Sequence, residues 1–253
     1  MTLVIITAIG VGGATVIGAV IGTLFKKIPH KYNDGILGLA AGVMLAAAVF
    51  GLIQPSLESG GKHVVWVTVA GILAGAFFLN AADRFIPHMH SMVGVDKEKH
   101  AGDVKALNRT LLFVLAIGIH NFPEGLAAGV SFGSEDISNA ITVATGIALQ
   151  NIPEGMIIIS PLMTAGLSRR KAFGIAALTG LAEVIGTMIG YWAVSITSVI
   201  LPFALAFAGG TMLYVISDEM IPETHNHGHE RLATYSILIG FAIMMLLDFY
   251  ISV

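Results

Sequence analysis

Two six-residue stretches, HNFPEG at 120–125 and QNIPEG at 150–155, are nearly identical and lie inside long apolar runs. Each contains a proline and a glutamate where an apolar helix ordinarily has neither. His120 and Glu124 of the first stretch are four residues apart, and the second stretch repeats this spacing with Gln and Glu. Residues four apart lie on the same face of a helix. Each stretch therefore predicts a helical turn that gathers polar side chains on one face.

The other residues of the two stretches extend this prediction. Pro123 and Pro153 each remove a backbone hydrogen bond and predict a bend in the helix. Gly125 and Gly155 follow directly and predict that a neighbouring helix comes close. The polar residues that share the face are His120, Asn121, Glu124, Gln150, Asn151 and Glu154. Imidazole nitrogen, carboxylates and amide oxygens together suit Zn²⁺, and also Fe²⁺ or Mn²⁺.

The composition indicates a membrane protein. The chain has 253 residues, of which 55% are hydrophobic and 11% are charged, whereas soluble domains carry roughly 25% charged residues. The net charge of −3 gives no basic field for nucleic acid. The chain has no cysteine, which excludes disulfides and thiolate metal sites.

Eight apolar segments predict an all-α fold with eight transmembrane helices. We expect one transmembrane transport domain over 1–253, whose first apolar run is a retained span. We also expect a cytoplasmic loop over 87–108 between the third and fourth spans. With the N-terminus outside, 12 of the 13 Lys and Arg residues fall on the cytoplasmic side, so we expect both termini outside. The predicted spans are 2–25, 35–57, 63–86, 109–131, 138–163, 170–192, 197–217 and 232–252.

A short internal similarity predicts an inverted repeat. AGVML at 41–45 in the second span resembles GGTML at 209–213 in the seventh, and each stretch leads to a proline, Pro55 or Pro222. Inverted repeats of this kind are common in transporters.

A third carboxylate, Glu183, lies midway along the sixth predicted span. An ionised carboxylate at the centre of a membrane helix costs about 2.5–3.5 kcal/mol on insertion scales. A bound dication would offset that cost for Glu183 and the two motif glutamates, and so would protonation.

The paired motif, in the fourth and fifth of eight spans, resembles the signature of the ZIP (ZRT/IRT-like) family of divalent metal transporters, in its prokaryotic form because the loops are short. The resemblance implies a two-metal centre between these two helices, midway across the membrane. It assigns one metal to His120, Gln150, Glu154 and a thioether contact from Met44, and the neighbouring metal to Asn121, Glu124, Asn151 and Glu183, with Glu124 and Glu154 able to bridge. Some members have Asp where this chain has Asn151, so the second metal is expected to bind more weakly or to regulate.

Further polar residues predict a metal entrance and exit. Glu58 ends the second span on the outside and is a candidate entrance ligand. The cytoplasmic stretches DRFIPHMH at 83–90 and SDEMIPETHNHGHE at 217–230 are rich in acids and histidines. The candidate exit ligands there are His88, His90, Asp218, Glu219, Glu223 and His225.

These patterns predict a transporter that carries zinc, or Fe²⁺, Mn²⁺ or Cd²⁺, across the cell (inner) membrane into the cytosol. There is no phosphate-binding loop of the G-x-x-x-x-G-K-[ST] type, so no ATP use is expected. Two alternatives stay open: an intramembrane di-metal carboxylate enzyme, against which stands the absence of an H-E-x-x-H motif, and a metal sensor without transport. The expected partners are divalent metal ions and the lipid bilayer, and the Gly- and Ala-rich helices are compatible with a homodimer.

Overall fold

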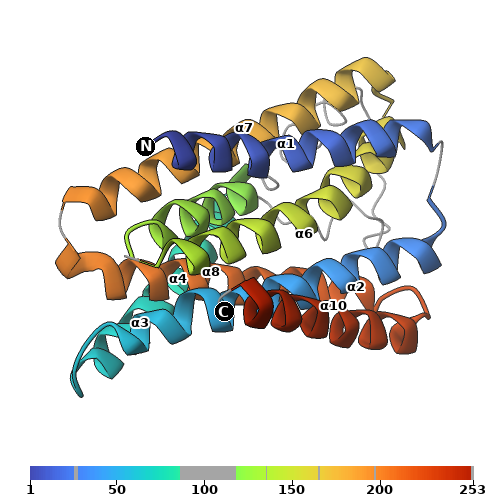
Figure 1. The fold of residues 1–253 in the computed structure, drawn as a ribbon. Helices are drawn as coiled ribbons and strands as arrows, with labels where there is room; N and C mark the ends of the chain where they lie inside the picture. Colours follow the sequence, from blue (N-terminus) through green and yellow to red (C-terminus); the bar gives the residue numbers. More distant parts are fainter. Residues whose placement is uncertain (26–27, 86–117, 135, 165, 197, 252–253) are drawn as a thin grey trace.

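The computed structural model describes residues 1–25, 28–85, 118–134, 136–164, 166–196 and 198–251, which form a bundle of long helices with no strand among them (Figure 1). The π-helical turns η1 (Ala47–Ile53) and η4 (Ile216–Met220) join α2 to α3 and α8 to α9, and a 3-10 turn η3 (Ser198–Ile200) precedes α8. The helices are α1 (Thr2–Leu24), α2 (His30–Ala46), α3 (Gln54–Glu58), α4 (Val64–Phe85), a helix over 118–131, α6 (Ile137–Thr164), α7 (Arg169–Ile196), α8 (Leu201–Val215), α9 (Ile221–Thr224) and α10 (Glu230–Ile251).

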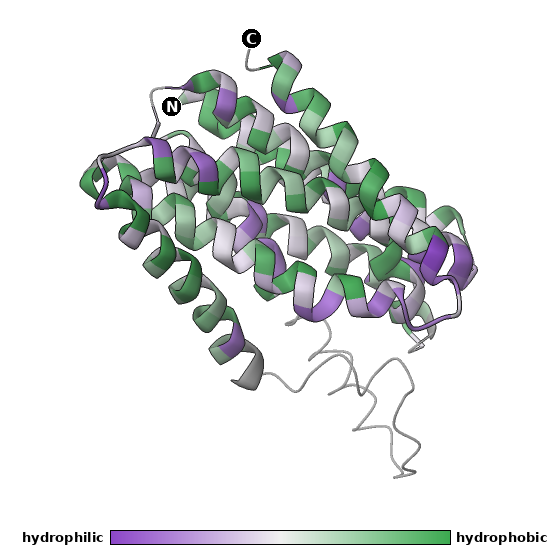
Figure 2. Cartoon of the chain, turned by 90° about the horizontal axis from the view of Figure 1, so that it is seen from below, coloured by the Kyte–Doolittle hydropathy of each residue, from purple (hydrophilic) through white to green (hydrophobic). Residues whose placement is uncertain are grey.

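Seven helical segments in the described part of the chain are long and apolar enough to cross a membrane. The prediction of an all-helical, membrane-type protein is confirmed for these residues. The expected eighth span at 109–131 is described only from residue 118, where the chain is helical through residue 131. The expected loop over 87–108 lies outside the described residues. Figure 2 shows apolar residues along the outer length of the helices and hydrophilic residues mostly near their ends.

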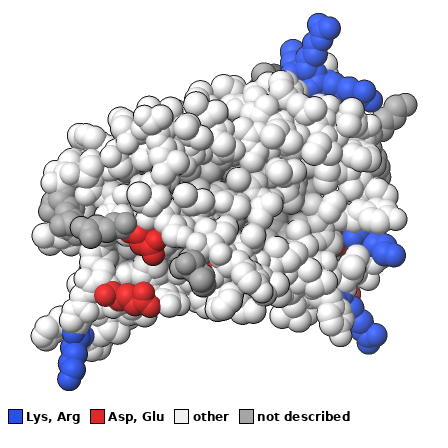
Figure 3. Space-filling view, viewed as in Figure 1, with Lys and Arg blue, Asp and Glu red and all other residues white. Residues whose placement is uncertain are grey.

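The two ends of the bundle differ in charge. The start of α1 and the end of α10 lie toward the same end of the bundle in both ribbon views (Figures 1 and 2). Most of the Lys and Arg side chains in Figure 3 gather at the opposite end, where α1 leads to α2 and α6 leads to α7. This asymmetry is what the distribution of basic residues in the sequence leads one to expect.

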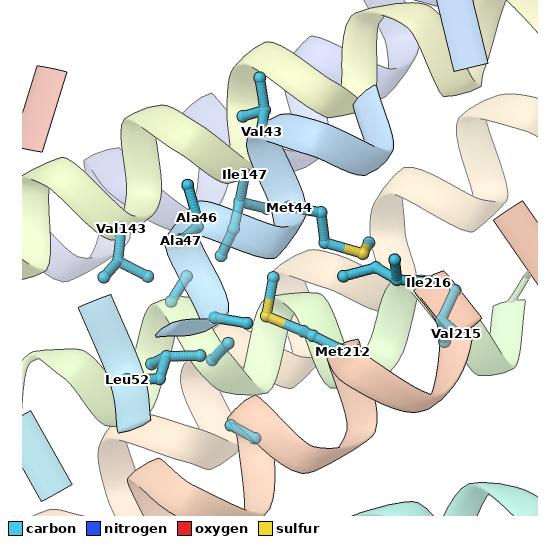
Figure 4. Packing of buried hydrophobic residues seen from close by; sticks show 14 of the residues in the cluster. Val43, Met44, Ala46, Ala47, Leu52, Val143, Ile147, Met212, Val215 and Ile216 are labelled. Carbon is cyan, nitrogen blue, oxygen red and sulfur yellow. The ribbon is translucent and has the colours of Figure 1, made fainter. Parts of the chain in front are cut away.

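The helices pack mainly in pairs that are distant in sequence. α1 packs along α6 and α7, α2 packs along α10, and α4 packs along α8. A cluster of buried apolar residues from α2, η1, α6 and α8 fills the space between them (Figure 4). Within this cluster, Met44, Met212 and Ile216 are almost completely buried, each with 1% of its surface exposed.

The irregular helical turns lie where the internal similarity ends. η1 is followed by α3 with Pro55 in its first turn, and η4 is followed by α9 with Pro222 in its first turn. Both parts of the repeat thus have the same order of α-helix, π-helix and proline. By contrast, α6 stays helical through Pro153 and Pro161. Because π-helical turns widen a helix and are frequent at functional sites, the two turns mark positions of interest beside the core.

Candidate metal centre

The glycine of each polar motif sits at a close helix crossing. A Cβ on Gly125 would clash with the backbone of Glu183 in α7, and one on Gly155 would clash with the backbone of Thr15 in α1. The expectation that these glycines let a neighbouring helix approach is therefore confirmed. The crossings bring α1, α7 and the two motif helices together around one buried point.

Glu183 occupies that point and is surrounded by donors. The Thr15 hydroxyl donates to Glu183 Oε1 at 2.6 Å, and Asn121 Nδ2 donates to the same oxygen. Asn151 Nδ2 donates to Glu183 Oε2 at 2.7 Å and to the carbonyl oxygen of Val11 at 3.2 Å. Glu183, Thr15 and Asn151 have no exposed surface, and Asn121 has 2%. The structure thus brings the predicted residues Asn121, Asn151 and Glu183 together, and it adds Thr15.

The two motif glutamates have a different environment. Glu124 is 2% exposed, and its Oε2 has no hydrogen-bond partner among the described residues. Glu154 Oε1 is likewise buried without such a partner. The charges of Glu154 and Glu183 both act on Glu124, and Gln150 lies beside it. Three acids and an amide therefore share one buried region, and two of the acids have oxygen atoms left for a further ligand.

His120 faces both this region and η4. Its Nε2 lies 2.8 Å from Glu219 Oε1, and the two side chains are 13% and 19% exposed. Glu154 interacts electrostatically with His120 and with Glu219. A residue predicted for the core and one predicted for the exit are thus direct neighbours, which the sequence did not indicate.

The described acids and histidines do not by themselves form a metal-binding cluster. Within the described ranges, no three His, Asp or Glu side chains lie close enough together to hold a metal ion. A metal here would therefore need ligands of another kind as well, such as amide oxygens, or a change of side-chain conformation.

Met44 lies in the apolar cluster. It is buried against residues of α8 and η4, and Figure 4 shows its side chain directed toward Ile216. Ile119, the neighbour of His120, packs against the same cluster. Met44 and Ile119 therefore belong to the same apolar region.

The predicted entrance and exit residues have separate locations. Glu58 is exposed at the end of α3 and accepts a hydrogen bond from Gln54 at 2.8 Å. Asp218 is exposed in η4, and Glu223 lies in α9. His225 contacts the carbonyl oxygen of Ile221 at 2.9 Å, and its other nitrogen lies 3.2 Å from the Thr234 hydroxyl. His88 and His90 lie outside the described residues.

A second cluster was missed by the sequence analysis. His227 Nδ1 lies 2.9 Å from Oδ1 of Asp34, a fully buried residue of α2, and His227 Nε2 lies 3.9 Å from Glu223. The ring of His30 stacks on that of His227 with centroids 4.3 Å apart. The available signal was Asp34 itself, directly before the predicted second span, because a carboxylate needs a partner when it is buried.

Comparison with known proteins identifies the family of this chain. The family model described as ZIP zinc transporter matches residues 94–248. The chain belongs to the ZIP family. The ZIP protein "Zinc transporter GufA" of Myxococcus xanthus is 40% identical over 94% of both chains. "Zinc transporter ZIPB" of Bordetella bronchiseptica is 38% identical over 93% of this chain and 77% of its own length. "Zinc transporter ZupT" of Chlorobaculum parvum is 37% identical over 92% of this chain and 91% of its own.

These findings confirm the resemblance stated from the two motifs. They make the chain a member of a family of membrane transporters, and they speak against the enzyme alternative, since the relatives are named zinc transporters. Divalent metal is accordingly the expected substrate class.

Proposed function

We propose that this chain carries Zn²⁺, or the related ions Fe²⁺, Mn²⁺ or Cd²⁺, across the cell (inner) membrane into the cytosol. The ion is a substrate that passes through an intramembrane site on the helices over 118–131 and 137–164. Residues 1–253 act as one transport domain in the lipid bilayer, and two copies form a homodimer through their small-residue helix faces.

The observation that supports this most is the presence of buried acceptor oxygens without partners. Glu124 Oε2, Glu154 Oε1 and Gln150 Oε1 lie in the interior with no hydrogen-bond partner among the described residues. Buried polar groups are almost always satisfied, and a buried charge without a partner is costly. A divalent cation would supply the missing interaction for several of these oxygens at once.

The family resemblance supplies the ligand set, and the partnerless oxygens of Glu124, Glu154 and Gln150 support it. We propose that His120, Gln150, Glu154 and Glu124 bind the transported ion, with Met44 as the thioether contact that the resemblance implies. Glu219 holds His120 from the exit side, as carboxylates commonly accept a hydrogen bond from the second ring nitrogen of a metal-binding histidine. Asn121, Asn151 and Glu183 lie at the adjacent position, which the family resemblance assigns, together with Glu124, to a second metal.

The route to and from this site uses the exposed polar residues at the two ends. Glu58 attracts cations at the entrance by its charge. Glu219 is the first exit residue, and the remaining residues of the proposed exit path are Asp218, Glu223, His225, His88 and His90.

Uptake of radioactive zinc into proteoliposomes tests the proposal. We expect flux with the native chain, competition by Cd²⁺, Fe²⁺ and Mn²⁺, and near-complete loss in Glu154→Gln, because a neutral amide cannot replace the anionic ligand. Glu230→Gln is the matched control, since it removes the same charge from an exposed position at the start of α10.

The outcomes separate the alternatives. Absence of flux with folded native protein that still binds zinc would support the sensor reading instead. Equal flux in native and Glu154→Gln protein would remove the site from the transport path. Loss of flux in Glu230→Gln as well would show that reconstitution rather than the site had failed, and the comparison would be repeated by uptake into intact cells.

A further inference from the structure

The buried acids of the core fall into two groups that differ in whether their oxygens have hydrogen-bond partners. Glu124 and Glu154 each have a buried oxygen without a partner among the described residues. Both oxygens of Glu183, in contrast, accept hydrogen bonds, one from Thr15 and Asn121 and the other from Asn151. A carboxylate that receives three hydrogen bonds has partners on both oxygens without any metal. Both carboxylate oxygens of Glu183, one of the residues expected to hold a second metal, are thus occupied by protein donors.

Asn151 links Glu183 to the backbone of α1 through two hydrogen bonds. Its Nδ2 donates both to Glu183 Oε2 at 2.7 Å and to the carbonyl oxygen of Val11 at 3.2 Å. An aspartate has no N–H group and would place a second carboxylate at that distance from Glu183. Two carboxylates this close cannot both be ionised unless a cation or a proton lies between them. The choice of Asn or Asp at 151 therefore decides whether this position needs a cation.

Thr15 is the third donor, and it lies outside both motifs. Its carbonyl oxygen is the atom that leaves no room for a Cβ on Gly155 of α6. One turn earlier, Gly12 and Gly180 pack backbone to backbone and bring α1 against α7. These two crossings fix the hydroxyl of Thr15 at 2.6 Å from Glu183 Oε1. Its location is thus set by the packing of α1 and not by chance proximity.

We infer that Thr15, Asn121 and Asn151 hold Glu183 as a hydrogen-bonded carboxylate that does not ligate metal, so that the core binds one ion, at His120, Gln150, Glu154 and Glu124. Thr15 and Asn151 are positioning residues, and residue 151 determines the number of ions bound. This inference rests on the proposed function.

The number of zinc ions bound by the purified full-length protein tests it. Zinc per protein is measured by equilibrium dialysis and elemental analysis, and variants are compared with the native chain so that surface histidines contribute equally. We expect Glu154→Gln to lose one zinc, Glu183→Gln to lose none, and Asn151→Asp to gain one. Loss of one zinc in Glu183→Gln, or an unchanged count in Asn151→Asp, would overturn the inference.

A second measurement does not depend on the folding of Glu183→Gln. Thr15→Val removes one donor, and Thr15→Ser keeps it. We expect Thr15→Val to lower the midpoint of thermal unfolding by the same amount in zinc-free and zinc-saturated protein, and Thr15→Ser to restore it. If saturating zinc abolishes the difference, the metal replaces the lost donor on Glu183 and the inference is wrong.

Failure of the proposed function gives a different result. In that case Glu154→Gln would keep all its zinc and proteoliposomes would show no flux, whatever the behaviour of Thr15 and Asn151. Flux that requires Glu154, together with a zinc count that falls in Glu183→Gln, would instead keep the transporter and restore the two-metal centre.

Discussion

His120 Nε2 and Glu219 Oε1 lie 2.8 Å apart, which joins the first polar motif to the π-helical turn η4. One residue belongs to the helix over 118–131 and the other to the segment between α8 and α9. The contact therefore connects the proposed metal site with the side of the molecule through which we expect metal to leave.

We predict that Glu219→Gln weakens zinc binding at the core. A carboxylate that holds the second nitrogen of a metal-binding histidine typically contributes about 10–100-fold in affinity. Titration calorimetry on the purified protein would measure this loss, with Glu230→Gln as the control. An affinity equal to that of the native chain would show that Glu219 does not orient His120.

Gly125→Ala should destabilise the fold, because an added Cβ meets the backbone of Glu183. Overpacking of this kind costs about 1–3 kcal/mol. Gly10→Ala and Gly174→Ala are matched controls in α1 and α7, since a Cβ there has nothing within 4 Å, and each should be neutral or more stable by about 0.5–1 kcal/mol. The midpoints of thermal unfolding in detergent measure these differences. Equal midpoints for all three variants would contradict the close approach of Gly125 to α7.

The Asp34–His227 pair should contribute to stability. His227→Ala removes the partner of a fully buried carboxylate, and leaving such a group unsatisfied costs about 1–3 kcal/mol. Thermal unfolding should show a lower midpoint for this variant than for the native chain. His63→Ala, the control, should keep the native midpoint because its side chain is exposed. A native midpoint in His227→Ala would mean that Asp34 finds another donor.

His225→Ala should have little effect on zinc uptake. Both ring nitrogens lie near protein oxygen atoms, of Ile221 and of Thr234, so the residue ties the end of α9 to α10. We expect uptake to fall by less than about twofold and stability to fall by about 1 kcal/mol. Complete loss of uptake with normal folding would make His225 an essential ligand of the exit.

Glu58→Gln should slow uptake at low ionic strength and have little effect at high salt. The side chain is exposed at the end of α3, so its attraction for cations is screened over roughly 10 Å at 0.1 M salt. Initial rates measured over a range of salt concentrations would show the two chains converging. Equal loss at every salt concentration would indicate a direct ligand instead.

The main features of the fold could be read from the sequence because they depend on local composition. Long apolar runs set the positions of the helices, since a chain in lipid must satisfy its own backbone. The motif spacing set which polar residues share a face, and the glycines that follow correctly indicated close crossings. The π-helical turns were not foreseen, although Pro55 and Pro222 mark the places where they occur.

The sequence by itself determined the class of protein, the polar residues of the core and the family. It could do so because hydropathy and helical period act over a few residues. Only the tertiary structure decided which partners those residues have. Thr15 reaches Glu183 across 168 positions, and His227 reaches Asp34 across 193. Such contacts depend on how whole helices cross, and the crossings are set by glycines on facing helices whose pairing no local pattern records.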